Sequence, residues 1–313
     1  MECVRLESPV ALGWPVPAVA VGNFDGVHRG HQALIAATVA RSRQLGGAAM
    51  ALTFDPHPAK VVNPAAAPTE LLSLEQKVRL LAALGLERLV VLPFTTAVAA
   101  QPPEDFVSEI LAGALGARWV LVGAGFRFGQ GRSGDVGLLE RLGRRHGFEV
   151  TAMPPVASEG APISSTRVRA ALSRGAMSEV ARLLGRPFLI EGSVERGARR
   201  GRTLGAPTAN VVPLNTLLPP DGVYAAWCHI ADEAPRHPAV VNVGRRPTFD
   251  GGNNSVHVEV HLLDFEGDLY GRSLGVELSE CLRGERRFPG AEALRAQIQS
   301  DIQQARQVLE KHG

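Results

Sequence analysis

The stretch PAVAVGNFDGVHRGHQALIAATVARSRQLGG, residues 17–47, joins a strand pattern directly to a helix pattern. Its first part, Pro17–Gly22, is a short apolar run of the kind found in strands that are buried on both faces. A helix is expected from about Arg29 to Leu45, because two glycines follow and can end a helix in the left-handed conformation. A buried strand that leads at once into a helix is typical of an α/β fold with a parallel sheet.

The same alternation continues through the first half of the chain. We expect further strands at Ala48–Phe54, Leu89–Phe94, Trp119–Gly123 and Phe148–Met153, and helices after the N-cap Ser73, from Pro103 and near Asp135–His146. Strands that alternate with helices in this way predict βαβ units and a mostly parallel sheet.

The pattern changes near Gly185. From Phe188 onward, short runs rich in β-branched residues are separated by Gly, Pro, Asp and Asn: FLIEGSV, TANVV, GVYAAWCHI, PAVVNVG, SVHVEVHLL and SLGVELSE. Strands spaced in this way predict an antiparallel sandwich or barrel. An apolar stripe at three- and four-residue steps predicts one closing helix over Pro289–His312. We therefore expect an α/β domain over residues 1–184 and a β domain with a terminal helix over residues 185–313.

Length and composition fit two globular domains. The chain has 313 residues, of which 45% are hydrophobic and 20% are charged, and this excludes a disordered or fibrous chain. The 33 Lys and Arg residues nearly balance the 31 Asp and Glu residues, so the chain carries no global signature of nucleic-acid or membrane binding.

Cysteine usage and the N-terminus indicate the compartment. The three cysteines form no CxxC pair, which argues against a disulfide framework or a cysteine zinc site and fits a reducing environment. The first residues lack the pattern of a signal peptide, and prolines interrupt the longest uncharged run. We expect a soluble cytoplasmic protein; its oligomeric state cannot be read from the sequence.

The first candidate site is GNFDGVHRGH, residues 22–31, between the expected strand and helix. Backbone N–H groups at a helix N-terminus attract phosphate, and glycines allow close approach. His28 and His31 are three residues apart, so they share one face of the first turn and could donate hydrogen bonds to phosphoryl oxygens. A chance surface pair or half of a metal site would have the same spacing. The strand–glycine–helix context favours the catalytic interpretation.

Two better-known phosphate motifs are excluded. VGAGFRFG, residues 122–129, departs from the dinucleotide fingerprint because Phe128 stands where a glycine is required. GARRGRT, residues 197–203, has one residue too few between its glycines for a P-loop, and Arg202 replaces the lysine.

The second candidate site combines a basic, glycine-rich segment with the motif PTAN. Gly197, Arg202 and Gly205 belong to a segment that can fold over phosphates. A solvated arginine cluster or an RNA-binding patch would have a similar composition, but no aromatic residue that could stack on a base is interleaved. Thr208 and Asn210 lie two residues apart on one face of an extended segment and offer hard oxygen donors suited to Mg²⁺.

The run SVHVEVHLL, residues 255–263, alternates between two faces of a strand. Val256, Val258, Val260 and Leu262 face one way, and His257, Glu259 and His261 face the other. The second face is either a His-Glu-His metal site or the polar side of a half-buried strand. The pattern alone favours the polar side.

In motifs that cover nearly its whole length, the chain resembles the bifunctional riboflavin kinase/FAD synthetases of bacteria. The first half carries GNFDGVHRGH, TFDPHP (residues 53–58), VGAGFRFG and ISSTRVR (residues 163–169), and the second half carries GRTLGAPTAN, DGVYAAW, NVGRRPTF, VEVHLLDFEGDLYG and LRGERRF. The resemblance implies an N-terminal Rossmann-like HxGH nucleotidyltransferase domain and a C-terminal riboflavin kinase β-barrel. At Gly125 the family commonly has Asp or Asn, so any polar contact to substrate from that side chain is missing.

For the first half, the resemblance implies adenylyl transfer from ATP to FMN, which yields FAD. His28 and His31 would be the catalytic residues that serve the transferring phosphates. The surrounding turn and a strand end would bind the substrates, through Gly22, Asn23, Phe24, Asp25, Gly30 and His57. Ser164, Ser165, Thr166 and Arg167 would contribute hydroxyls and a bidentate phosphate donor, although Ser-Ser-Thr before an apolar helical run also matches a plain helix cap.

For the second half, the resemblance implies phosphorylation of riboflavin to FMN. Glu259 falls at the family's catalytic glutamate and would take the proton of the ribityl 5′-hydroxyl as this attacks the γ-phosphorus of ATP. Gly197, Arg202, Gly205, Thr208 and Asn210 would bind ATP, and Thr208 and Asn210 would hold Mg²⁺. The expected partners are the small molecules ATP, riboflavin and FMN, without nucleic acid or membrane. The alternatives are a kinase whose adenylyl-transfer half is weak, given Gly125, and a flavin or nucleotide sensor without turnover.

Overall fold

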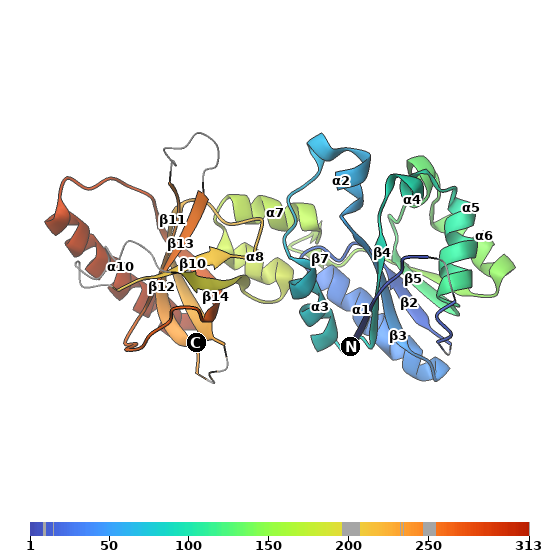
Figure 1. The fold of residues 1–313 in the computed structure, drawn as a ribbon, viewed down its shortest axis with the longest axis horizontal. Coiled ribbons are helices and arrows are strands. Elements are labelled where there is room, and N and C mark those ends of the chain that lie inside the picture. The colour runs from blue at the N-terminus through green and yellow to red at the C-terminus, as the bar shows by residue number, and fades with distance from the viewer. Residues whose placement is uncertain are drawn as a thin grey trace. The chain divides into compact units, whose positions relative to one another are not determined.

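The structure, a computed structural model, describes residues 1–8, 11–14, 16–195, 207–231, 233, 235–246 and 255–312. The chain forms two compact units, Met1–Ser165 and Thr166–Gly313. Each unit is built around its own sheet, and Figure 1 traces both. The predicted domain boundary at residues 184/185 stays a prediction.

The first unit contains a six-stranded parallel sheet in the order β1-β4-β3-β2-β5-β6. Its strands are β1 (Glu2–Arg5), β2 (Ala18–Val21), β3 (Ala49–Asp55), β4 (Arg88–Pro93), β5 (Trp119–Gly123) and β6 (Glu149–Met153). All four residues of β2 are buried, as expected of a central parallel strand that is covered on both faces.

Helices and turns connect these strands. They are α1 (Arg29–Leu45), α2 (Pro58–Val62), η1 (Pro64–Ala66), α3 (Leu74–Ala83), α4 (Thr96–Ala100), α5 (Pro103–Asp105), η2 (Phe106–Ala114), η3 (Gln130–Arg132) and α6 (Val136–His146), with a short hairpin of β7 (Ala157–Ser158) and β8 (Ala161–Pro162). The chain builds β3 and β4 on one side of β2 and then returns to place β5 on the other side. This reversal creates a switch point at the carboxyl end of β2, where open α/β sheets bind their ligands.

The strands and helices predicted for this unit are confirmed. The predicted capping box at the start of α3 is present, because Ser73 and Gln76 each bond the other's backbone N–H. The helix expected from Pro103 continues after one turn as the π-helix η2, whose wide turns bury an apolar face. Strand β1 was not predicted; it pairs with β4 at the edge of the sheet.

The second unit contains a closed antiparallel barrel, which resolves the predicted choice between a sandwich and a barrel. Its strand order is β10-β13-β12-β11-β14-β9. The strands are β9 (Phe188–Glu195), β10 (Ala209–Pro213), β11 (Gly222–Ile230), β12 (His237–Arg246), β13 (Ser255–Leu262) and β14 (Ser273–Gly284). Val258, Val260 and Leu262 are buried while the residues between them are not, so the predicted alternation along β13 is confirmed for this part of the strand.

Helices complete this unit. α7 (Ser165–Ser173) and α8 (Met177–Leu184) precede the barrel in the chain, and α8 packs against β9 and β14. The terminal helix α10 (Ala291–His312) lies against β11, β12 and β14 and buries Ala305, Val308 and Leu309 with Ala225 of β11. The predicted terminal helix and its apolar stripe are confirmed.

Candidate active sites

The loop after β2 is held in an unusual backbone conformation. Phe24 and Val27 have positive φ angles of 49° and 40°, although neither is glycine, and Gly26 between them has a φ of 82°. Non-glycine residues rarely adopt such angles, and they cluster at functional sites where the surrounding structure enforces them. The loop leads His28 into the N-cap position of α1, at the carboxyl end of the central strand.

The two histidines of this loop are in direct contact. The rings of His28 and His31 are stacked, with centroids 3.7 Å apart and an angle of 13° between their planes. Nδ1 of His28 accepts a hydrogen bond of 3.3 Å from the backbone N–H of His31, so a neutral His28 carries its proton on Nε2. The predicted pair on one helical face is therefore an organised pair, with His28 oriented by the helix terminus.

His31 is held in its neutral form. Burial, together with the neighbouring His28 and Lys77, keeps the pKa of His31 well below its ordinary value. Its Nδ1 is buried and has no hydrogen-bond partner among the described residues. A buried polar atom without a partner carries a free-energy cost, and at a functional site it indicates a group that a ligand completes.

Gly30 is needed because of the position of the His28 ring. A Cβ atom at residue 30 would lie 3.1 Å from Cε1 and 3.2 Å from Nδ1 of His28. Ordinary contacts between such atoms are about 3.5–4.0 Å. The glycine between the two histidines therefore leaves room for their stacked arrangement.

Asn23 and Asp25 tie this loop to other segments of the first unit. Asp25 is buried and its Oδ1 accepts a hydrogen bond of 2.9 Å from the backbone N–H of Leu71. The amide of Asn23 lies 3.1 Å from Nε2 of His57, which caps α2 through its Nδ1. The structure thus brings Asn23, Asp25 and His57 together with the histidine pair, while Gly22 and Phe24 belong to the same loop.

The ISSTRVR segment divides between the two units. Oγ of Ser165 donates a 2.8 Å hydrogen bond to the carbonyl of Asp25, so this end of the segment adjoins the first site. Ser164 directly precedes α7, the position of a helix cap. Thr166 and Arg167 belong to the second unit, where Nε of Arg167 lies 3.6 Å from a carboxylate oxygen of Glu179.

In the barrel, a row of polar residues crosses three adjacent strands. Asn210 of β10 is the direct register partner of Glu259 of β13, and Glu259 is in turn the partner of Asn242 of β12. Side chains of directly opposite residues lie on the same face of an antiparallel sheet with Cβ atoms about 4.5–5.5 Å apart. The row therefore places an amide on either side of the Glu259 carboxylate. Asn242 was missed from the sequence, although it lies in the motif NVGRRPTF.

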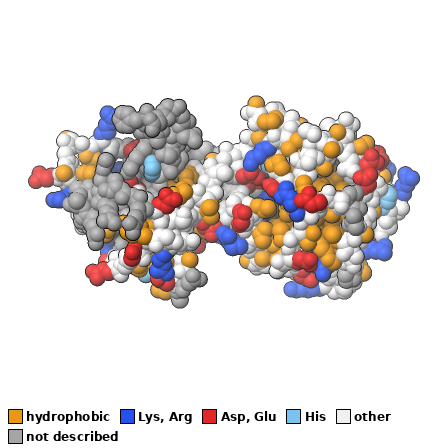
Figure 2. Space-filling view, in the orientation of Figure 1, with side chains coloured by type: hydrophobic (Ala, Val, Ile, Leu, Met, Phe, Trp, Pro, Cys, Tyr) orange, Lys and Arg blue, Asp and Glu red, His pale blue; other side chains and the backbone are white. Residues whose placement is uncertain are grey.

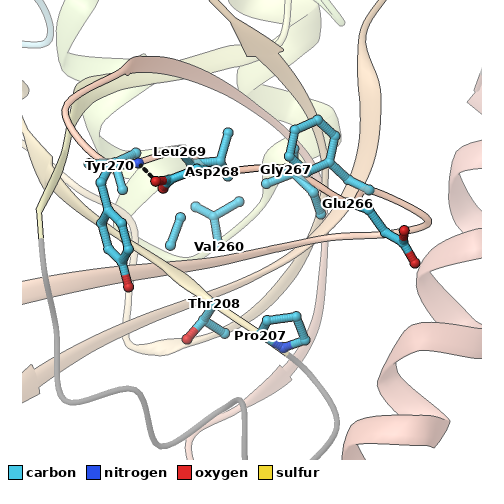
Figure 3. A pocket seen from close by; sticks show the side chains of 12 residues that line it. Pro207, Thr208, Val260, Glu266, Gly267, Asp268, Leu269 and Tyr270 are labelled. Atoms are coloured by element: carbon cyan, nitrogen blue, oxygen red, sulfur yellow. Dashed lines mark hydrogen bonds between the residues drawn. The ribbon is translucent and has the colours of Figure 1, made fainter.

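The second unit also contains a cavity of about 570 Å³, which is lined by none of the three residues of this row. Its wall is formed by residues of β9, β10 and β13, by the two residues before β10 and by the segment that follows β13: Val194, Pro207, Thr208, Ala209, Val260, Leu262, Phe265, Glu266, Gly267, Asp268, Leu269 and Tyr270. Figure 3 shows Thr208 on one side of the cavity and Asp268 and Tyr270 across from it. The segment 265–270 was not predicted as part of a site; its match to the family in VEVHLLDFEGDLYG was the available signal.

The remaining predicted residues have other outcomes. Gly197, Arg202 and Gly205 lie outside the described residues. In the part of the chain that the structure describes, no group of three or more His, Cys, Asp or Glu could hold a metal ion. Nδ1 of His261 lies 2.8 Å from the carbonyl oxygen of Pro207, so this ring contacts the backbone just before Thr208.

Each half of the chain matches the model of a known protein family, and relatives match along most of the chain. The FAD synthetase family model matches residues 14–167, and the riboflavin kinase family model matches residues 184–309. The bifunctional riboflavin kinase/FMN adenylyltransferase of Escherichia coli K12 is 40% identical over 289 residues, which is 92% of this chain and 91% of that protein. The protein of the same name from Listeria monocytogenes is 36% identical over 317 residues and covers 99% of both chains.

A solved structure has the same fold. It is described as a macrolide-efflux protein from Streptococcus pneumoniae, is 30% identical, covers 98% of this chain and 99% of that chain, and has a TM-score of 0.87. Within the described ranges of this chain, no helix has both the length and the apolar character needed to cross a membrane. On the strength of the matches to both halves and to full-length relatives, the chain belongs to the bifunctional riboflavin kinase/FMN adenylyltransferase family.

Proposed function

We propose that this enzyme makes FAD in two steps, one in each half of the chain. ATP and riboflavin give ADP and FMN in the C-terminal half, and ATP and FMN then give diphosphate and FAD in the N-terminal half. The observation that carries the proposal is that each unit has its own polar constellation, the His28–His31 pair in one and the Asn210–Glu259–Asn242 row in the other. The kinase-family match that begins at residue 184 supports a division at residues 184/185.

In adenylyl transfer, a phosphate oxygen of FMN attacks the α-phosphorus of ATP, and diphosphate leaves. The reaction needs no covalent enzyme intermediate, so the protein contributes positioning and charge stabilisation. Nε2–H of His28 and the backbone N–H groups at the start of α1 are the donors for phosphoryl oxygens. His31, kept neutral and with its Nδ1 unpartnered among the described residues, adds a second imidazole to the same site.

In riboflavin phosphorylation, the ribityl 5′-hydroxyl attacks the γ-phosphorus of ATP. Glu259 is the general base that accepts the hydroxyl proton, since a carboxylate within hydrogen-bonding reach suffices for this role. The amides of Asn210 and Asn242 flank Glu259 on the neighbouring strands, where they orient the carboxylate and the substrate.

Mg²⁺ fits the donors beside Glu259. Thr208 and Asn210 offer a hydroxyl and an amide oxygen, and both are hard ligands of the kind that bind Mg²⁺ together with substrate phosphates. When bound, the ion would neutralise charge on the β- and γ-phosphates of ATP.

The cavity beside Thr208 suits the uncharged part of a substrate. Apolar residues such as Leu262 and Phe265 line it together with Asp268, whose carboxylate lies across from Thr208 in Figure 3. A carboxylate repels phosphate but accepts hydrogen bonds from sugar hydroxyls. A substrate bound here places its hydroxylated, aromatic part in the cavity and its phosphate-bearing end toward Thr208.

Small molecules are the proposed partners, in the cytoplasm, where ATP is available and cysteines remain reduced. On the face drawn in Figure 2, the Lys and Arg side chains of the described residues are interspersed with Asp and Glu and form no continuous basic surface. Nucleic-acid binding proteins usually present such a surface.

A product assay tests the proposal. Riboflavin and Mg·ATP are incubated with the protein, and FMN and FAD are separated by chromatography; both should form. Glu259→Gln should abolish FMN formation and spare FAD formation from supplied FMN, whereas His28→Ala should do the reverse. A folded variant that loses both activities would refute separate sites. FMN without FAD from the native chain would favour a kinase with a weak second half, and neither product would favour a sensor.

A further inference from the structure

Lys77 is a buried lysine whose ammonium group has no direct partner among the described residues. Its side chain belongs to α3, and the residue is only 5% exposed. No hydrogen bond or ion pair joins its ammonium group to any described residue. Lysine is almost never buried to this extent unless its ammonium group is paired, so this position indicates a charge that a ligand or an ion completes.

Lys77 adjoins the histidine site. The segment before α3 is joined to the GNFDGVHRGH loop by the hydrogen bond from Leu71 N–H to Asp25 Oδ1. The charge on Lys77 is also close enough to His31 to contribute to the lowered pKa of that imidazole. Two polar groups that lack hydrogen-bond partners among the described residues, Nδ1 of His31 and the ammonium of Lys77, therefore belong to one site.

A purely structural role explains this lysine poorly. Lys77 is the fourth residue of α3, near the positive end of the helix dipole, where a cation is destabilising. Burial lowers the pKa of Lys77, while the carboxylates of Asp25, Glu70 and Asp55 favour its charged form. Glu70 already has an ion-pair partner in Lys60. The surroundings thus favour a positive charge, but no described carboxylate forms an ion pair with it.

We propose that Lys77 binds a phosphate group of the reacting nucleotides in the adenylyl-transfer site. The inference rests on the proposed function of this half of the chain and adds a residue to it. An ammonium group is a point donor for phosphate oxygens, and it stabilises best the group on which charge develops as the bond breaks. In FAD synthesis that group is diphosphate, and FMN phosphate is the second possible source of the same chemistry.

The reverse reaction isolates this site from the kinase. An oxygen of pyrophosphate attacks the adenylyl phosphorus of FAD, the bond from that phosphorus to the FMN phosphate oxygen breaks, and ATP and FMN are released. FMN and ATP are measured with Mg²⁺ present, while pyrophosphate and FAD are varied separately. The variants are Lys77→Met and Lys77→Gln, and the matched control is Lys60→Met, which removes an exposed, ion-paired lysine from the same cluster of charges.

Loss of a charge-assisted hydrogen bond should raise the KM for pyrophosphate by on the order of 10- to 100-fold in both Lys77 variants. The KM for FAD and the rate of riboflavin phosphorylation should stay within about twofold, and Lys60→Met should match the native protein. A rise in the KM for FAD instead would support the proposal with FMN phosphate as the ligand. Unchanged KM values for both, in variants that still phosphorylate riboflavin, would overturn it. If the native chain itself neither makes nor cleaves FAD, the proposed function fails and not only the role of Lys77.

Discussion

Replacing Gly30 by alanine should slow FAD synthesis while leaving the stability of the protein nearly unchanged. The new Cβ would lie 3.1 Å from Cε1 of His28, about half an ångström inside ordinary contact distance. The His28 ring would have to move away, and it is held by its stacking on His31 and by its hydrogen bond to the His31 backbone.

The expected loss of rate follows from the size of this displacement, and the expected stability follows from two opposing contributions. Misplacing a reacting group by about 1 Å costs roughly 100-fold in rate, so half that shift predicts about a tenfold fall in kcat for FAD synthesis. Alanine stabilises a helix relative to glycine by up to about 1 kcal/mol, whereas a weakened cap costs about 0.5–2 kcal/mol. The two changes in the free energy of unfolding nearly cancel, so the variant should stay folded.

Gly137→Ala is the matched control. Gly137 is also the second residue of a helix, α6, but a Cβ there would meet its nearest neighbour, Oδ1 of Asp135, at an ordinary 3.5 Å. Both variants are compared by urea unfolding and by FMN and FAD formation. Gly137→Ala should retain both activities. If Gly30→Ala makes FAD within twofold of the native rate, the argument that glycine is needed to seat His28 is wrong.

Three further predictions follow from individual residues. Burial lowers the pKa of His31 in the folded protein, so the contribution of His31 to stability is complete above the unfolded pKa near 6.5 and declines as the pH falls toward the folded pKa. Thermal unfolding from pH 8 to 5 should show this loss of stability, and the loss should be smaller in His31→Gln. Asn242→Ala should slow riboflavin phosphorylation by about tenfold and leave FAD formation from FMN unchanged, and an equal loss of both would argue against its place beside Glu259. The Gly125→Asn variant should fold normally, since nothing lies within 4 Å of a Cβ at this position, and it should have a lower KM for FMN in FAD synthesis. A KM that is unchanged or higher would show that the missing side chain does not limit FMN binding.

Several features of the site could be read from local sequence alone. The buried strand, the glycine turn and the helix around His28 depend on hydrophobic periodicity and on glycines within one short stretch, and the structure confirms this order of elements. The alternation that separates Glu259 from Val258 and Val260 follows in the same way from the two-residue period of a strand. Local pattern also predicted the terminal helix and its buried face.

Other features depend on contacts between distant parts of the chain. Asn210 and Asn242 flank Glu259 only because of the register of three strands in a closed barrel, and strand register depends on turns and packing that no single strand encodes. A lysine in an amphipathic helix is normally expected at the surface, so the burial of Lys77 became visible only in the tertiary structure. Local sequence thus specifies which reactive groups are present and which strands and helices carry them. Which of these groups meet, and which lack a partner among the described residues, depends on packing between segments far apart in the chain.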